Sequence, residues 1–177
     1  MIYIKCLDSS ITKWIKTIGA YSLVMVEPYI YCLEEDIDLS FFLFNVFTEK
    51  NVLSAGIIAD HYDPFIKTLL DFLYNKQKNE CLLASDILLQ ALASNDRLIL
   101  IRGQQFLKKI ARMDQQRADI YVACNGNISL CCKRMYMHRN SIGNWLNKFE
   151  SLYQFNLRTV DNWMVYKILK KFIEYYA

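Results

Sequence analysis

The sequence is poor in glycine and histidine. Only five glycines and two histidines occur among its 177 residues. It contains no glycine-rich phosphate-binding loop, no nucleophile elbow and no paired cysteine and histidine motif. These absences predict that the chain is not an enzyme and uses no cofactor. A small degenerate enzyme in the N-terminal half is the weakest alternative.

The six cysteines lack the spacing of a metal site. They lie at positions 6, 32, 81, 124, 131 and 132, and no two of them form a C-x-x-C pair. Because only two histidines could supply further ligands, zinc binding is disfavoured. Adjacent thiols such as Cys131 and Cys132 rarely close into an unstrained disulfide, so a redox switch is a minor alternative. We expect free thiols in a reducing cytosol.

Long apolar runs are missing as well. The runs at residues 41–47 and 52–59 are well short of the ~20 residues that span a bilayer. Residues 1–7 do not resemble the start of a secretory signal. Hydrophobic residues nevertheless make up 54% of the chain, which is enough for a sizeable core. We expect a soluble, cytoplasmic protein of two compact units with no membrane partner.

The N-terminal part has the pattern of a mixed module of strands and helices. Short segments rich in Val, Ile, Leu and aromatic residues predict strands at 22–27, 29–33, 41–47 and 52–58. Asp63 and Pro64 predict the cap and first turn of a helix, and further helices are expected over 80–93 and 97–112. The predicted fold class is α+β. Residues 1–111 would form an α/β sensor or dimerisation module, and residues 112–177 an all-helical domain.

Two acidic groups in this module suggest a metal or acid–base hypothesis, because carboxylates serve both purposes. The groups are Glu34, Glu35, Asp36 and Asp38, and then Asp60, His61 and Asp63. Loop and cap residues explain both groups more simply. We therefore predict neither a metal site nor catalytic residues.

Residues 125–152 have the pattern of two short helices joined by a tight connection. In the second helix, an apolar stripe at i, i+3, i+4 and i+7 comprises Ile142, Trp145, Leu146 and Phe149. Polar and basic side chains fall on the opposite face. A helix that enters the major groove of DNA needs such a face, although many solvated surface helices also have one.

The boundaries of these helices are also marked. Residues 125–127, Asn-Gly-Asn, are suited to ending one helix and starting the next with Asn127 as its cap. A short helix is expected over 129–135, followed by a break at 136–137 and the striped helix from His138. A final helix is expected after a cap at Asp161.

The runs NGNIS, CCKRMYMHRNSI and WLNKFESLYQFNLR resemble the C-terminal helix-turn-helix of the PucR/CdaR group of bacterial transcription regulators. They are more distantly similar to the helix-turn-helix of Fis. The HRNS tetrapeptide followed by Ile142 and Leu146 is the most specific part, and the resemblance covers about residues 115–172. It implies a DNA-binding transcription regulator whose recognition helix starts at His138.

The resemblance also implies which side chains meet DNA. Arg139, Asn140 and Ser141 would lie at the N-terminal end of the recognition helix, where contacts to bases and phosphates begin. His138 would either contact a base or cap the helix. The predicted DNA-binding residues are Arg134, His138, Arg139, Asn140, Ser141, Asn144 and Lys148.

Two positions depart from the family pattern. The family tends to have basic or aromatic side chains two and four residues after Ser141, where this chain has Gly143 and Trp145. Gly143 costs about 1 kcal/mol relative to alanine inside a helix, which is easier to tolerate where DNA or another helix approaches closely. Trp145 would either widen the apolar stripe or stand exposed. The alternative function is therefore a protein-interaction module that keeps the fold without DNA binding. Cys132 falls where the family places a small residue, and we expect it to be buried.

Charge gives an independent indication of the partner. Residues 112–177 carry ten Lys or Arg against five Asp or Glu, whereas residues 1–111 carry eleven against thirteen. A basic domain joined to a near-neutral one is typical of proteins that bind duplex DNA. We also expect a homodimer, because one short recognition helix reads few base pairs. An unknown small-molecule or protein effector at the N-terminal module is a further hypothesis.

Overall fold

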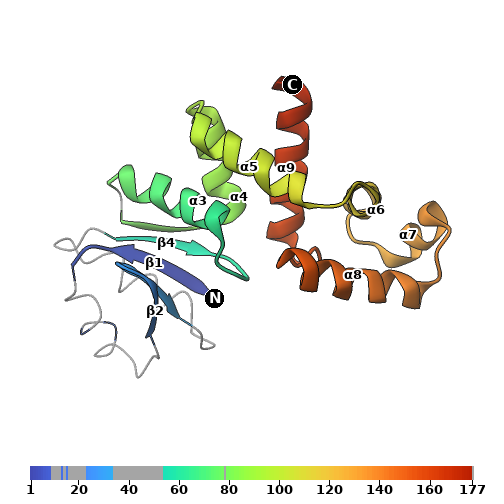
Figure 1. Cartoon of the computed structure of the whole chain (residues 1–177), viewed down its shortest axis with the longest axis horizontal. Helices are drawn as coiled ribbons and strands as arrows, with labels where there is room; N and C mark the ends of the chain where they lie inside the picture. Colours follow the sequence, from blue (N-terminus) through green and yellow to red (C-terminus); the bar gives the residue numbers. More distant parts are fainter. Residues whose placement is uncertain (9–12, 14, 16–22, 34–53, 78, 177) are drawn as a thin grey trace. The chain divides into compact units, whose positions relative to one another are not determined.

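The computed structural model describes residues 1–8, 13, 15, 23–33, 54–77 and 79–176. Contacts divide the chain into two compact units, Met1–Asn95 and Asp96–Ala177 (Figure 1). This division falls earlier in the chain than the boundary expected between residues 111 and 112. The predicted α+β class, a module of strands and helices followed by helices alone, is confirmed.

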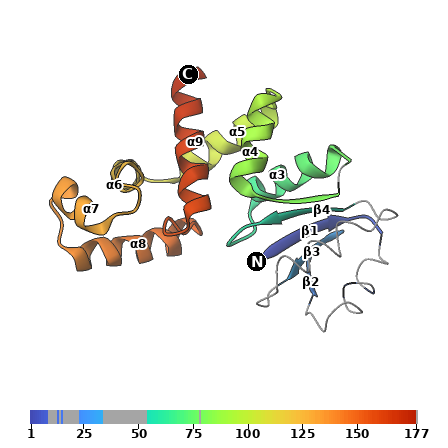
Figure 2. The ribbon, with the colours of Figure 1, turned by 180° about the vertical axis from the view of Figure 1, so that it is seen from behind.

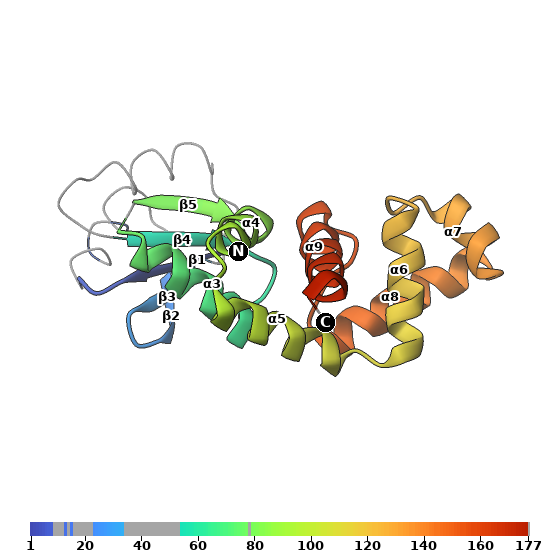
Figure 3. The same cartoon turned by 90° about the horizontal axis from the view of Figure 1, so that it is seen from above.

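The first unit is built on a five-stranded sheet with the order β2-β3-β1-β4-β5. The strands are β1 (Ile2–Cys6), β2 (Leu23–Glu27), β3 (Ile30–Leu33), β4 (Ser54–Ile58) and β5 (Glu80–Leu83). Neighbouring strands pair antiparallel except β4 and β5, which pair in parallel. Figure 2 shows β3 between β1 and β2, and Figure 3 shows β5 beside β4.

The described strands agree in part with the sequence prediction. Strands β2, β3 and β4 confirm those predicted at 22–27, 29–33 and 52–58, while the segment 41–47 lies outside the described residues. Strand β1 was not predicted. The prediction of one helix over 80–93 was wrong at its start, because β5 pairs with β4 before α4 (Ala84–Ala93) begins.

Helix α3 (Pro64–Asn75) follows β4 and packs on one side of the sheet against β1 and β4 (Figure 1). Its predicted cap is confirmed, since the Asp63 carboxylate accepts hydrogen bonds from the N–H groups of Phe65 and Ile66 at 2.9 and 2.8 Å. Burial alone would raise the pKa of Asp63, but the His61 ring, whose Nε2 lies 3.7 Å from the carboxylate, and the hydrogen bonds from these N–H groups outweigh it and lower the pKa. Asp63 therefore stays ionised where it caps the helix.

The second unit consists of helices in its described residues. They are α5 (Arg97–Lys109), α6 (Arg112–Ala123), α7 (Ile128–Met135), α8 (Arg139–Tyr153) and α9 (Val160–Tyr176). The helix predicted over 97–112 is shorter than expected, because Ile110 leaves the helical conformation and α6 starts anew at Arg112. No helix within the described ranges is long and apolar enough to cross a membrane.

Helix α9, the last helix of the second unit, packs against both α5 and α6. It crosses α5 so closely that a side-chain carbon at Gly103 would lie 2.4 Å from Leu169. Its Tyr166 hydroxyl donates a hydrogen bond to the Asp119 carboxylate of α6 at 2.8 Å. The predicted cap at Asp161 was wrong, because α9 begins at Val160 and Asp161 lies within the first turn.

Candidate functional site

The connection into α7 has the geometry that its sequence predicts. Asn125 and Gly126 both adopt positive φ angles, 50° and 71°, which end α6 and redirect the chain. Asn127 then caps α7, and its side-chain oxygen accepts a hydrogen bond from the N–H of Leu130 at 3.1 Å. The expected stop, cap and short helix are thereby confirmed.

The turn between α7 and α8 is tight and open to solvent. Tyr136 ends α7 in the left-handed conformation, with φ 53°, and its side chain is 96% exposed. His138 is the N-cap of α8, and its Nδ1 accepts a hydrogen bond from the N–H of Asn140 at 3.4 Å. The capping role considered for His138 is therefore seen in the structure.

One face of α8 is buried throughout. Ile142, Trp145, Leu146 and Phe149 are each at most 5% exposed, as their spacing predicts. Trp145 packs edge-to-face against Phe149, with ring centres 5.6 Å apart. The alternative of an exposed Trp145 was wrong, because this ring belongs to the core.

Asp114 of α6 fixes the orientation of this buried face. Its carboxylate accepts a hydrogen bond from Trp145 Nε1 at 3.0 Å and another from the Tyr153 hydroxyl at 2.8 Å. The same hydroxyl accepts a hydrogen bond from the N–H of Ala111 at 3.1 Å. Hydrogen bonds to a carboxylate are stronger than those between neutral groups. The bonds to Asp114 therefore join α6 to α8 in addition to the apolar contacts of the core.

The predicted site residues lie at the surface, on α8 and on the end of α7. Arg134 lies in the last turn of α7, His138 caps α8, and the others lie along α8. All seven are exposed, namely Arg134, His138, Arg139, Asn140, Ser141, Asn144 and Lys148. The fold therefore brings together, on two adjacent helices, the side chains that the sequence singled out.

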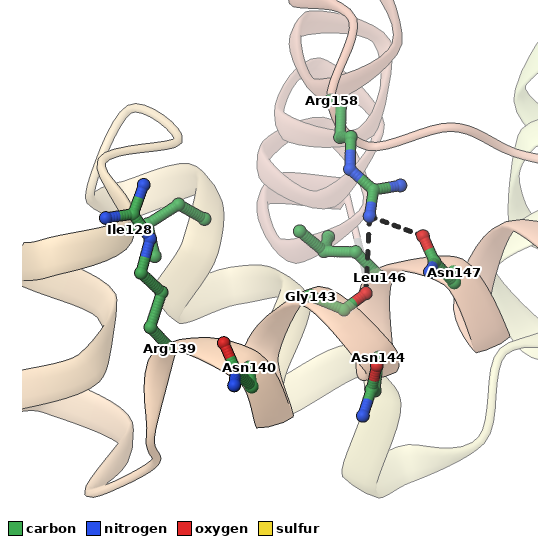
Figure 4. A pocket seen from close by; sticks show the side chains of 8 residues that line it. All are labelled: Ile128, Arg139, Asn140, Gly143, Asn144, Leu146, Asn147 and Arg158. Carbon is green, nitrogen blue, oxygen red and sulfur yellow. Dashed lines mark hydrogen bonds between the residues drawn. The ribbon is translucent and has the colours of Figure 1, made fainter.

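A hollow of about 400 Å³ opens along α8 (Figure 4). Arg139 lies at one end of it and Arg158 at the other, with Asn140 and Asn144 between them along the helix. The Arg158 guanidinium donates hydrogen bonds to the Gly143 carbonyl at 3.2 Å and to Asn147 Oδ1 at 2.6 Å. It also lies 3.4 Å from the Glu150 carboxylate.

Three side chains of this region, Arg158, Asp114 and Asn147, were not predicted as site residues from the sequence. Arg158 stands in the segment before α9, eleven residues beyond its partner Asn147, so no helical spacing relates it to α8. Asp114 precedes its partner Trp145 by 31 residues. Asn147 was expected to point outward from α8 but was not predicted to take part in a site. Only the family-like ending NLR pointed to Arg158.

Gly143 is not required by packing within the described structure. A side-chain carbon built at this position would meet no atom within 4 Å. Neither another helix nor Arg158 approaches closely enough to exclude that first side-chain carbon. The space that a side chain at position 143 would occupy, called here the gap at Gly143, is therefore empty of described atoms.

The cysteines and the acidic groups were the other candidates in the sequence. Cys131, and not Cys132, is the fully buried thiol of α7, and burial raises its pKa to about 12. A thiol with so high a pKa is unreactive at neutral pH. The first acidic group, residues 34–38, lies outside the described residues. Among the described residues, no three metal-ligating side chains gather into a metal site.

Comparison with known families agrees with this geometry. Residues 118–169 match the family model of the PucR C-terminal helix-turn-helix domain, which confirms the resemblance noted over residues 115–172. The matched segment contains α7 and α8 and ends within α9. No match to the chain was found among curated proteins. The second unit thus carries a helix-turn-helix of the type found in a family of DNA-binding regulators.

Proposed function

We propose that this PucR-type helix-turn-helix binds duplex DNA and that the chain acts as a transcription regulator. The division of α8 into two faces carries the proposal. Ile142, Trp145, Leu146 and Phe149 fix one face in the core, while the first three turns of the opposite face present polar and basic side chains. An α-helix with this division fits the major groove, where side chains reach base edges and phosphates flank them.

Cationic side chains surround the face that would meet DNA. Arg134, Arg139 and Lys148 are exposed and, within the described residues, form no ion pair. Side chains of this kind neutralise phosphates and release the counterions that DNA holds. These three would position the domain on the duplex, and the side chains between them would read sequence.

The first unit supplies dimerisation or signal input in this proposal. One recognition helix contacts few base pairs, and helix-turn-helix regulators commonly bind two half-sites about 34 Å apart. A homodimer would provide the second helix. Sedimentation that finds only monomers at micromolar concentration, with and without DNA, would contradict this part of the proposal.

The alternative of a protein-interaction module has less support. It rested on the departures from the family pattern at Gly143 and Trp145, and Trp145 offers no exposed aromatic surface to a protein partner, because it is 5% exposed and bonded to Asp114. Protein interfaces tend to have an apolar centre depleted of charge. From residue 139 to 148 the outward face of α8 has amides and cations instead, and exposed Leu152 follows only in its last turn, which suits a nucleic acid better.

Retention on genomic DNA as a function of salt tests the proposal. We expect the native chain to bind with strong salt dependence, and Arg139→Ala to lose about 0.9 from the slope of log K against log salt if one phosphate contact is removed. Arg102→Ala is the matched control, because Arg102 is an exposed arginine of α5 outside the helix-turn-helix. Binding without salt dependence, or an equal loss in both variants, would contradict DNA binding by α8.

A further inference from the structure

Three asparagines run along α8 on the line opposite its buried stripe. At 3.6 residues per turn, positions 140, 144 and 147 fall within an arc of about 60°. The centre of that arc lies on the far side of the helix from Ile142, Trp145, Leu146 and Phe149, all of which are buried. The most outward line of α8 is thus a row of neutral amides.

Cationic residues lie at the edges of this row and not within it. Arg139 falls on one flank together with Gly143, and Lys148 falls on the other together with Ser141, by the same helical spacing. A helix seated in the major groove has bases in front of it and a phosphate backbone on each side. The placement of neutral amides in the middle and cations at both edges matches that cross-section.

The amides differ in whether they are available to a ligand. Asn147 is engaged, because its Oδ1 accepts a hydrogen bond from Arg158 at 2.6 Å. The side chains of Asn140 and Asn144 are exposed and make no hydrogen bond to any other described residue. Both line the hollow of about 400 Å³, next to the gap at Gly143 (Figure 4).

We infer that Asn140 and Asn144 are the base-reading pair of this protein and that each one specifies an adenine in the major groove. Adenine presents an acceptor, N7, beside a donor, the N6 amino group, and an asparagine amide pairs with both at once. Guanine presents two acceptors in the same place, which suits arginine and not asparagine. This inference rests on the proposed DNA binding and names the sequence that α8 would select.

The spacing of the two amides limits where the adenines lie. Positions 140 and 144 are four residues apart, or about 6 Å along the helix axis. Successive base pairs are about 3.4 Å apart. The two specified adenines, on the same or on opposite strands, therefore lie within two base-pair steps of one another. Gly143 places no side chain beside them, so base edges can approach α8 closely on that flank.

Selection of binding sites from a randomised duplex library tests the inference on the full-length chain. We expect the native chain to enrich two adenines within two steps, Asn140→Ala to lose the preference at one of them and Asn144→Ala at the other. Both variants keep the native salt slope, because neither asparagine carries a charge. Lys148→Ala is the matched control, and it keeps both adenines while its salt slope falls by about 0.9.

Replacing single atoms in the selected DNA provides a second measurement. A 7-deazaadenine at either specified position removes the N7 acceptor and leaves the charge of the duplex unchanged. We expect affinity to fall by roughly 5- to 150-fold in the native chain. The variant that lacks the corresponding asparagine should show no further loss.

Two further variants test the gap in the helix. Gly143→Ala and Gly143→Leu meet no described atom within 4 Å at the first side-chain carbon, so both should fold. We expect Gly143→Leu to weaken binding to the selected site at least tenfold more than binding to random duplex. Equal loss on both duplexes would overturn the close approach at Gly143.

The outcomes separate this inference from the function on which it rests. A selected sequence dominated by guanine, or adenines unaffected by both asparagine substitutions, would overturn the inference and leave DNA binding standing. A native chain that enriches no sequence and binds without salt dependence would overturn the proposed function, and the inference with it.

Discussion

In the first unit two lysines pair with carboxylates, whereas three exposed cations of the second unit, on α7 and α8, form no ion pair with a described residue. Lys5 lies 2.5 Å from Asp71, and Lys67 pairs with Glu27, so both pairs join the sheet to α3. In the second unit, Arg134, Arg139 and Lys148 are exposed and form no ion pair with any described residue. Charges of the first kind join elements of the fold, and charges of the second kind are the ones that the proposed function assigns to DNA.

The two units also differ in net charge, which is negative in the first unit and positive in the second. Residues 1–95 carry seven Lys or Arg against twelve Asp or Glu, and residues 96–177 carry fourteen against six. The balances are −5 and +8, which together give the +3 of the whole chain. This contrast is larger than the one obtained with a boundary at residue 111, because α5 brings its own basic residues to the second unit. An excess of positive charge in the domain that would bind DNA favours its encounter with the duplex.

The largest predicted effect is a loss of stability that is confined to the second unit and comes from a change in its core. Trp145→Ala removes a ring that packs on Phe149 and leaves the Asp114 carboxylate without one of its donors. We expect a loss of about 3–5 kcal/mol in the free energy of unfolding. Hydrogen exchange should show faster exchange in α6, α7 and α8, with the first unit unchanged. Trp163→Ala is the control, because Trp163 of α9 is only partly buried.

If the strands of the first unit exchanged faster to the same extent in Trp145→Ala, the two units would not be energetically separate. The comparison between them would then fail at the level of stability, whatever their charges.

The next largest effect should distinguish an unpaired cation of the second unit from an ion-paired cation of the first unit, by DNA affinity and by stability. We expect Arg139→Ala to weaken binding to specific DNA by about 1–3 kcal/mol, or roughly 5- to 150-fold, at an unchanged melting temperature. Lys5→Ala should do the reverse, with up to about 1 kcal/mol lost in stability and no loss of DNA affinity. Fluorescence anisotropy and thermal unfolding on the same samples measure both. A fall in melting temperature for Arg139→Ala as large as that for Lys5→Ala would contradict the distinction.

A smaller, pH-dependent effect should be confined to the first unit. The pKa of Asp63 is lowered in the fold, so its contribution is present above its ordinary value near 4 and is lost as the pH falls through the lowered value. Asp63→Ala should cost about 1 kcal/mol at neutral pH by removing the cap of α3. Asp63→Asn retains a capping oxygen and should remove the pH dependence of that contribution. Urea unfolding followed from pH 7 downward distinguishes the three proteins, and an unchanged pH profile in Asp63→Asn would contradict the assignment.

The smallest effect should be a gain in stability in the second unit. Gly143→Ala places a methyl group where no described atom lies within 4 Å, and alanine favours a helix interior by about 1 kcal/mol over glycine. We expect the free energy of unfolding to rise by about that amount. Ser141→Ala, on the same exposed face, is a control for removing or adding small side chains there. A loss of stability in Gly143→Ala would mean that the gap is occupied in the folded protein.

Several elements followed directly from local sequence. Asp63 and Asn127 were each expected to cap a helix, and each does so. His138, for which a cap and a base contact were both left open, caps α8. The stripe of α8 was also correct, because helical spacing decides which side chains share a face. The predicted site residues lie together for the same reason, since all of them belong to two consecutive helices.

Other elements depended on partners far along the chain. Residues 80–83 were expected to begin a helix, but the edge of β4 offers them a parallel strand partner. The position of Arg158 against Gly143 and Asn147 could not be predicted from spacing, because it depends on the path of the chain between α8 and α9.

By itself, then, the sequence determined the caps at Asp63 and Asn127, the helical stripe and the family to which residues 118–169 are similar, because these depend on side chains within a turn or two of each other. Only the tertiary structure decided that Trp145 belongs to the core, since its partner Asp114 comes from another helix. It also decided that Asn147 is engaged by Arg158 while Asn140 and Asn144 stay exposed. Such choices depend on which helices pack together, and local periodicity carries no information about that packing.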